Sequence, residues 1–141
     1  MKEHDGVIVF GGDEPALRAA RAADTYRTSL RPPEAGKPGL MSSGRSKATP
    51  LLDGLLDGQH VVRFKMEPGS RTALHTHDCD QLLIVIAGTG IIASATEEIE
   101  MFAGCMVLIP AGEPHIHATR AGEGSQTIAI TRTGHSTDII E

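Results

Sequence analysis

The sequence predicts an all-β fold built as a small barrel, on three observations. Short apolar or alternating runs follow one another at even spacing from Leu51 to Thr133, separated by turns that contain Gly, Pro or Glu. Glycine accounts for 16 of the 141 residues, which favours many tight turns. The chain has only three Phe, one Tyr and no Trp, so the barrel core must be mostly aliphatic.

The length predicts one domain with an appendage: residues 1–50 as N-terminal arm, short helix and linker, and residues 51–141 as the barrel. Within the appendage, Val7–Phe10 is a short β-type run, expected to be an arm that pairs with an edge strand. Asp13 can cap an Ala-rich helix of about ten residues. From position 29 to 50, Pro, Gly and Ser predominate, which indicates a connector.

Charge and composition narrow the possible partners. The formal net charge is −5 and the basic residues are scattered, which argues against a nucleic-acid or anionic-membrane surface and favours a small-molecule substrate. No apolar run approaches the roughly 18 residues of a membrane helix, and no signal peptide opens the chain. With Cys79 and Cys105 as its only cysteines, the protein is expected to be cytoplasmic and reduced.

Within the predicted barrel, two runs define the strand pattern. Residues 60–66 alternate between apolar and polar side chains, as in a half-buried strand. Leu82 to Ala87 is apolar on both faces, so both faces must be covered, by a second sheet layer or by a dimer partner. Together with the Val7–Phe10 arm, this run favours a homodimer. Further short strands are predicted at 91–95, 99–102, 106–109, 115–119 and 126–131.

A candidate metal site begins with His75 and His77. Side chains of a strand alternate with period two, so these two imidazoles project from the same face and can share one ion. His115 follows Pro110 and Gly112, in a second turn-marked pair of strands. Two separated segments with compatible ligands predict one metal site inside the barrel.

The residues around these histidines resemble the two motifs of the cupin superfamily, over a region from about Leu51 to Thr133. The first motif falls on Gly69, His75, His77, Gln81 and Gly88. The second falls on Gly104, Pro110, Gly112, His115 and Thr119. All spacings match, and only the residue types at 81 and 119 depart from the family pattern. The resemblance implies a cupin-type double-stranded β-helix, a jelly-roll barrel, and commonly a dimer.

The resemblance also implies one divalent transition metal (Fe, Mn, Ni, Zn or Cu) held by His75, His77, Gln81 and His115. Gln81 replaces the family's acid. An amide oxygen is neutral, so the ion would keep its full charge and favour an anionic carboxylate or enolate. Two alternatives stay open: Gln81 lies outside the ligand shell, which leaves three histidines, or no metal binds and a histidine acts as a base.

His117 shares a face with His115 and is our candidate catalytic residue, moving a proton. It could instead support a ligand, be a further ligand, or only line the pocket. His60 is expected near the barrel rim, and no specific role is expected for His4 or His135. The apolar candidates for pocket lining, each also explicable as plain core, are Phe64, Met66, Leu83, Phe102 and Met106.

The function predicted from these patterns is a metal-dependent enzyme for a small, oxygen-rich or anionic organic molecule. The neutral Gln81 favours Lewis-acid isomerase, decarboxylase or lyase chemistry, with a dioxygenase as the rival. A non-catalytic metal- or small-molecule-binding module is the alternative, because nothing in the sequence proves turnover. No carboxylate that could act as a base is assigned to the pocket.

Overall fold

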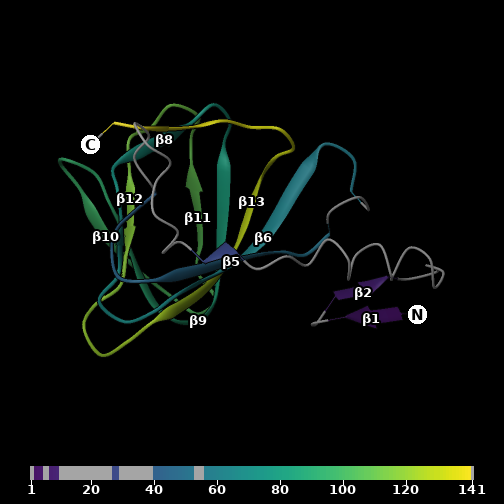
Figure 1. Ribbon diagram of the computed structural model, residues 1–141, viewed down its shortest axis with the longest axis horizontal. Coiled ribbons are helices and arrows are strands. Elements are labelled where there is room, and N and C mark those ends of the chain that lie inside the picture. Colours follow the sequence, from purple (N-terminus) through teal and green to yellow (C-terminus); the bar gives the residue numbers. More distant parts are fainter. Residues whose placement is uncertain (1, 5–6, 10–26, 29–39, 53–55, 141) are drawn as a thin grey trace.

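The computed structural model describes residues 2–4, 7–9, 27–28, 40–52 and 56–140, and every described element is a strand. Two antiparallel sheets face each other and share one long strand, β9 (Gln81–Ala93), as in a jelly-roll barrel (Figure 1). The prediction of an all-β jelly-roll barrel is therefore confirmed.

The sheets divide the strands as follows. The first sheet contains, in spatial order, β3 (Arg27–Thr28), β5 (Ser46–Pro50), β6 (Gln59–Met66), β13 (Ser125–Arg132), the first half of β9 and β11 (Met106–Ile109). The second contains β10 (Glu98–Phe102), the second half of β9, β12 (Ile116–Ala118), β7 (Arg71–Thr72) and β4 (Met41–Ser43). A separate pair is formed by β8 (His75–His77) and β14 (Thr137–Ile139).

Strand β9 passes from one sheet to the other at Gly88. Up to that residue it pairs with β11 and β13, and from Thr89 onward it pairs with β10 and β12. Gly88 has a φ of +70°, which side-chain-bearing residues rarely adopt, and a Cβ there would collide with the carbonyl oxygen of Gly124. The sequence suggested two strands on either side of this glycine. Because glycine permits the corner, they are one continuous strand.

Between the sheets lies an aliphatic core. Leu83 and Val85 point inward from β9 and are almost fully buried. They pack with Ile92, Met101 and Ile109 from the second half of β9, β10 and β11. Burial of each such side chain is worth about 1.5–3 kcal/mol, so this cluster is a main source of stability for the barrel.

The barrel begins earlier in the chain than the sequence indicated. β5 pairs with β6 along its whole length, and β4 pairs with β7, so residues 41–50 belong to the two sheets. The connector interpretation is wrong for these residues. In the Ser-Ser-Gly sequence that suggested a loop, Ser42 and Ser43 belong to β4. Only Gly44, which has a φ of +70° and packs against Ser70, is in the turn to β5.

Part of the predicted N-terminal appendage can also be compared. A strand is present at β2 (Val7–Val9), but it pairs with β1 (Lys2–His4) to form a hairpin instead of joining a barrel edge. The predicted helix from Asp13 lies outside the described residues. Among the residues that the structure describes, no helix is long and apolar enough to cross a bilayer.

Over β9 and β11, the outer face of the first sheet is apolar. Leu82, Ile84 and Ile86 of β9 alternate with the inward-facing core residues, and the register sets Met106 and Leu108 of β11 opposite Ile84 and Leu82. Ile86, Met106 and Leu108 are 47%, 64% and 61% exposed. We name these five residues the outer apolar face. In the described part of the chain, nothing covers its three most exposed members.

Candidate metal centre

His75 and His77 lie on β8 and point to the same side, as the alternation predicted. Their side chains are 1% and 9% exposed, whereas Thr76 between them is only half-buried. β8 is held by pairing with β14, in which Thr137 is opposite His77. Figure 1 shows β8 and the C-terminal stretch together at one end of the barrel.

The second ligand segment joins the first directly through its backbone. The N–H of His75 donates to the carbonyl of His115, and the N–H of His115 donates to the carbonyl of His75, both at 3.0 Å. Asp80 reinforces the approach, because its carboxylate accepts the N–H of Ala111 at 2.8 Å. The two motifs recognised in the sequence are thus brought together in space.

Four buried histidines converge at this point: His75, His77, His115 and His117. Each offers one ring nitrogen, and these nitrogens all lie within 4.8 Å of one another. A nitrogen–metal bond of about 2.1 Å separates two ligand nitrogens by at most about 4.2 Å, so a small adjustment would fit them around one ion. His117, which the sequence assigned to proton transfer, lies inside the cluster.

Hydrogen bonds orient two of the rings. The Nδ1–H of His75 donates to the Ala73 carbonyl at 2.7 Å, and the Nδ1–H of His115 donates to the Glu113 carbonyl at 2.8 Å. A carbonyl can only accept, so the proton of the neutral ring is on Nδ1 and the lone pair on Nε2. Nδ1 of His77 lies 2.9 Å from the hydroxyl of Thr137, which can donate or accept. Such bonds orient metal-binding imidazoles.

Burial keeps the cluster uncharged near neutral pH. Desolvation, with a smaller contribution from the His115 ring, lowers the pKa of His75 to about 4, although the bond to Ala73 opposes the shift. Desolvation, with His75 and His115 nearby, lowers the pKa of His77 to about 3. Burial likewise lowers the pKa of His115 and, more strongly, of His117. Neutral imidazole is the form that binds a metal.

The chemistry of the donors fits a metal ion. Nε2 of His77, Nε2 of His115 and Oε1 of Gln81 are buried and have no hydrogen-bond partner. Leaving such groups unpaired costs about 1–3 kcal/mol each, and a cation would satisfy all three. Gln81, at the start of β9, lines the same cavity as His75, His77 and His117. The structure therefore supports the alternative in which His117 is a further ligand, and it places Gln81 in the same cavity, while their coordination roles stay predictions.

Three histidines of the cluster, His75, His77 and His117, line a cavity of about 210 Å³, which we call the histidine cavity. Phe64 and Leu83 line it, as the sequence suggested, together with the apolar residues Leu40, Ala48, Val62 and Ala129. Phe102 and Met106 do not: they are 61% and 64% exposed on the outside of the barrel. On both strands, side chains alternate between the two faces as the sequence predicted. The alternation alone does not say which of the two faces is the interior of the barrel.

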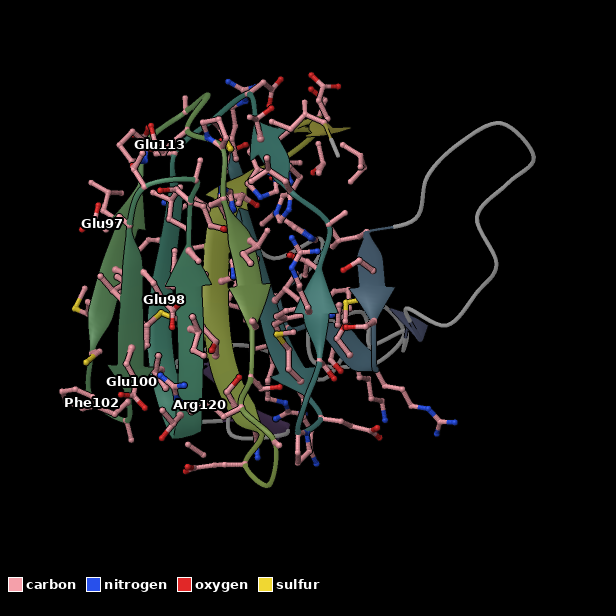
Figure 2. All side chains as sticks on the ribbon, turned by 90° about the vertical axis from the view of Figure 1, so that its left-hand side faces the viewer. Glu97, Glu98, Glu100, Phe102, Glu113 and Arg120 are labelled. Atoms are coloured by element: carbon pink, nitrogen blue, oxygen red, sulfur yellow. The ribbon has the colours of Figure 1, made fainter. Side chains whose placement is uncertain are left out.

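The carboxylates lie elsewhere. Among the described residues, no Asp or Glu lines the histidine cavity. Glu97 and Glu113 border a second hollow of about 270 Å³ between β10 and β11, which touches the cluster only at His115. Figure 2 shows these two residues at one end of this side of the molecule, with Glu98, Glu100 and Arg120 further along. Arg120 lies 3.7 Å from Glu98 and 3.6 Å from Glu100, so this acidic side is partly neutralised.

Sequence reasoning missed three polar residues of the cavity. His135, for which no role was expected, lines it with its ring 5.3 Å from that of His77. Thr131 and Thr137 also line it, and Thr137 contacts His77. No motif marks these positions. By contrast, Thr119, the second departure from the family pattern, lies outside the cavity and crosslinks the barrel: its hydroxyl donates to the Glu67 carbonyl and accepts the Ser70 N–H.

Comparison with solved structures identifies similar folds. A cupin-like protein from Thermotoga maritima is 24% identical, with a TM-score of 0.65 over 71% of this chain and 79% of its own. The polyketide cyclase RemF from Streptomyces resistomycificus is 18% identical, with a TM-score of 0.68 over 84% and 82%. A cupin-superfamily sugar phosphate isomerase from Silicibacter pomeroyi is 20% identical, with a TM-score of 0.65 over 86% and 80%. No curated protein matches the chain.

The family model described as "Cupin domain" matches residues 62–130. This region contains both motifs, the four histidines and Gln81, and it extends from β6 into β13. The matched motifs, the jelly-roll topology and the convergence of the motif histidines agree with one another, and residues 62–130 form a cupin domain.

Proposed function

We propose that this protein is a metal-dependent enzyme that acts on a small organic molecule with an apolar body and a metal-binding oxygen. One observation carries the proposal: buried, uncharged donor atoms without hydrogen-bond partners converge beside an apolar cavity. A divalent transition metal bound there would supply Lewis-acid polarisation of a substrate oxygen.

In this proposal the chain's residues have separate tasks. His75, His77, His115 and His117 hold the ion, and Gln81 adds a neutral oxygen. Because all five donors are uncharged, the site keeps a net positive charge and favours a substrate oxygen that carries, or develops, negative charge. The apolar wall of Val62, Phe64 and Leu83 excludes water and strengthens this attraction.

The cavity lining also narrows the substrate class. Within the described residues, no Lys, Arg, Asp or Glu lines the cavity. A phosphate group would have no cationic partner there apart from the metal, so the lining disfavours a sugar phosphate as substrate. An apolar-bodied ketone, enol or keto acid fits better, and turnover by isomerisation, decarboxylation or elimination needs only the Lewis acid and a proton carrier.

The metal in this proposal can be tested directly. Protein purified from metal-supplemented culture is expected to contain about one equivalent of a transition metal by elemental analysis. Gln81→Ala should lower the affinity about tenfold in competition with a chelator, because it removes one neutral oxygen ligand. Gln126→Ala, on β13 outside the cavity, is the matched control. Less than about a tenth of an equivalent, with no binding on titration, would refute the proposal, and unchanged affinity in Gln81→Ala would leave a site of histidines alone.

The reaction class is open to a separate test. Metal-loaded protein is expected to convert single-ring aryl keto acids or β-diketones at the same rate in oxygen-free and in air-saturated buffer, because Lewis-acid chemistry consumes no oxidant. Product formation by chromatography and an oxygen electrode give the two readings. Oxygen uptake matching substrate loss would contradict this class and identify a dioxygenase.

We also propose that two copies of the chain associate through the outer apolar face. Ile86, Met106 and Leu108 form contiguous exposed apolar surface on neighbouring strands. Charged residues are absent from these five positions. Contiguous apolar surface on a sheet is the usual mark of an association surface, and a second copy offers a face of matching shape.

A single charge should disrupt this association. Leu108→Lys is expected to convert a dimer to a monomer in light scattering, because two lysines would be buried near each other at a symmetric interface. Ile99→Lys, an exposed change on β10 outside the outer apolar face, should leave the dimer intact. A wild-type monomer at micromolar concentration would exclude the proposal.

A further inference from the structure

The wall of the histidine cavity changes character along its length. β6 and β13 pair along this wall: Val62 faces Ala129, His60 faces Thr131, and Phe64 faces Thr127, which does not itself line the cavity. At one end the ring of Phe64 packs 6.0 Å from that of His117. At the other, two residues beyond the apolar pair Val62–Ala129, the pair His60–Thr131 is polar. A strand rises about 3.3 Å per residue, so the polar pair lies about 7 Å along the strands from the pair Val62–Ala129.

Thr131 is a polar residue of the cavity wall. Its side chain is 7% exposed and lines the cavity. Its hydroxyl is not one of the buried polar atoms that lack a hydrogen-bond partner, and it can both donate and accept a hydrogen bond. A ligand in the cavity can therefore use it.

His135 adds an acceptor at the same end. Its Nδ1–H donates to the carbonyl of Arg132 at 3.1 Å, so Nε2 of the neutral ring keeps its lone pair. The ring centroid lies 6.1 Å from that of His60 and 5.3 Å from that of His77. Thr131 can donate or accept, and His135 can accept.

We propose that Thr131 and His135 form a second polar subsite, which binds an uncharged oxygen at the end of the ligand away from the metal. A hydroxyl group suits it best, because it can accept from Thr131 while donating to Nε2 of His135. A carboxylate does not, since no cationic side chain among the described residues lines the cavity. The inference rests on the proposed function and names its substrate class: a metal-binding oxygen, an apolar middle and a distal hydroxyl.

The cavity volume limits the size of the apolar part of the ligand. A cavity of about 150 Å³ accommodates benzene. The histidine cavity, at about 210 Å³, therefore suits one ring with substituents. Phe64 and Leu83 flank the space that such a ring would occupy.

The test uses zinc-loaded protein and hydroxamate probes, with binding measured by calorimetry. Benzohydroxamate presents a chelating group on a bare ring, and its 3-hydroxy and 4-hydroxy derivatives add one hydroxyl. At least one derivative is expected to bind about fivefold tighter than benzohydroxamate, as for one net hydrogen bond to a buried partner. The 4-carboxy derivative should bind more weakly than benzohydroxamate.

Variants at Thr131 test whether the tighter binding of a hydroxylated probe depends on the Thr131 hydroxyl. Thr131→Val keeps the shape and removes the hydroxyl, so the preference for the hydroxylated probe should disappear while benzohydroxamate binds as before. Thr131→Ser keeps a hydroxyl at this position and should retain the preference, which would show that the site tolerates substitution. Thr127→Val, on the same strand and buried but outside the cavity lining, is the matched control and should retain it too.

The outcomes separate the two proposals. If wild-type protein does not bind benzohydroxamate, the proposed metal-dependent function itself is wrong. If benzohydroxamate binds and no hydroxylated probe binds tighter, or if Thr131→Val keeps the preference, only the distal subsite is overturned. If the 4-carboxy probe binds tighter than benzohydroxamate, the distal subsite is also overturned, because the cavity would then accept a negatively charged group at that end.

Discussion

Replacing His115 with alanine is expected to lower the affinity for a divalent metal by at least about a hundredfold. The change removes a buried nitrogen that has no other partner and belongs to the four-histidine cluster. Loss of a supporting group alone typically costs metal sites tenfold to a hundredfold, and loss of a ligand should cost no less. The backbone bridge to His75 survives, because it uses only main-chain atoms.

The matched control is His60→Ala, which alters the same cavity outside the cluster. It should keep the metal affinity within about threefold, because no bond to the ion is removed. Competition with a fluorescent chelator measures both variants, and circular dichroism checks the fold. Equal losses in the two variants would show that the cavity responds as a whole and that His115 has no particular bond to the ion.

Acid should destabilise the metal-free protein, starting well above the pH at which carboxylates titrate. The pKa values of His75 and His77 are lowered to about 4 and about 3, while an unfolded chain has histidines near 6.5. Below pH 6.5 the unfolded state therefore binds protons that the folded state does not. The free energy of unfolding should fall by at least about 5 kcal/mol between pH 7 and 4.

Urea unfolding of metal-free protein at pH 7, 6, 5 and 4 measures this slope. His117→Phe removes one of the four histidines whose pKa is lowered by burial, so its slope below pH 6.5 should be shallower by up to about 1.4 kcal/mol per pH unit. A wild-type free energy that stays constant from pH 7 to 5 would show that the histidines protonate in the folded state as readily as in the unfolded one.

The three-histidine core of the site was predictable because local rules place those residues. Period-two alternation sets His75 and His77 on one face, and Gly88 and Gly112 mark turns that only glycine readily makes, each with a positive φ. The spacing of the two motifs then identified His115 as their partner. Each of these inferences depends on a few neighbouring residues.

Other features depend on distant contacts that no local pattern records. His135 and Thr137 reach the cavity because β14 pairs with β8, a contact across 60 positions of sequence. Residues 41–50 look like a loop by composition, but partners in both sheets make them strands. Phe102 and Met106 were assigned inward, and the tertiary arrangement of β10 and β11 sets them outward.

The pairing of β8 with β14 also has a consequence for the order in which the protein matures. A ribosome delivers His75 and His77 early, but Thr137, which contacts His77, is made 60 residues later. A growing chain therefore carries these ligands on a segment that still lacks its neighbouring strand. The ion would be captured firmly only after the barrel has closed, so loading depends on the metal available to the finished protein.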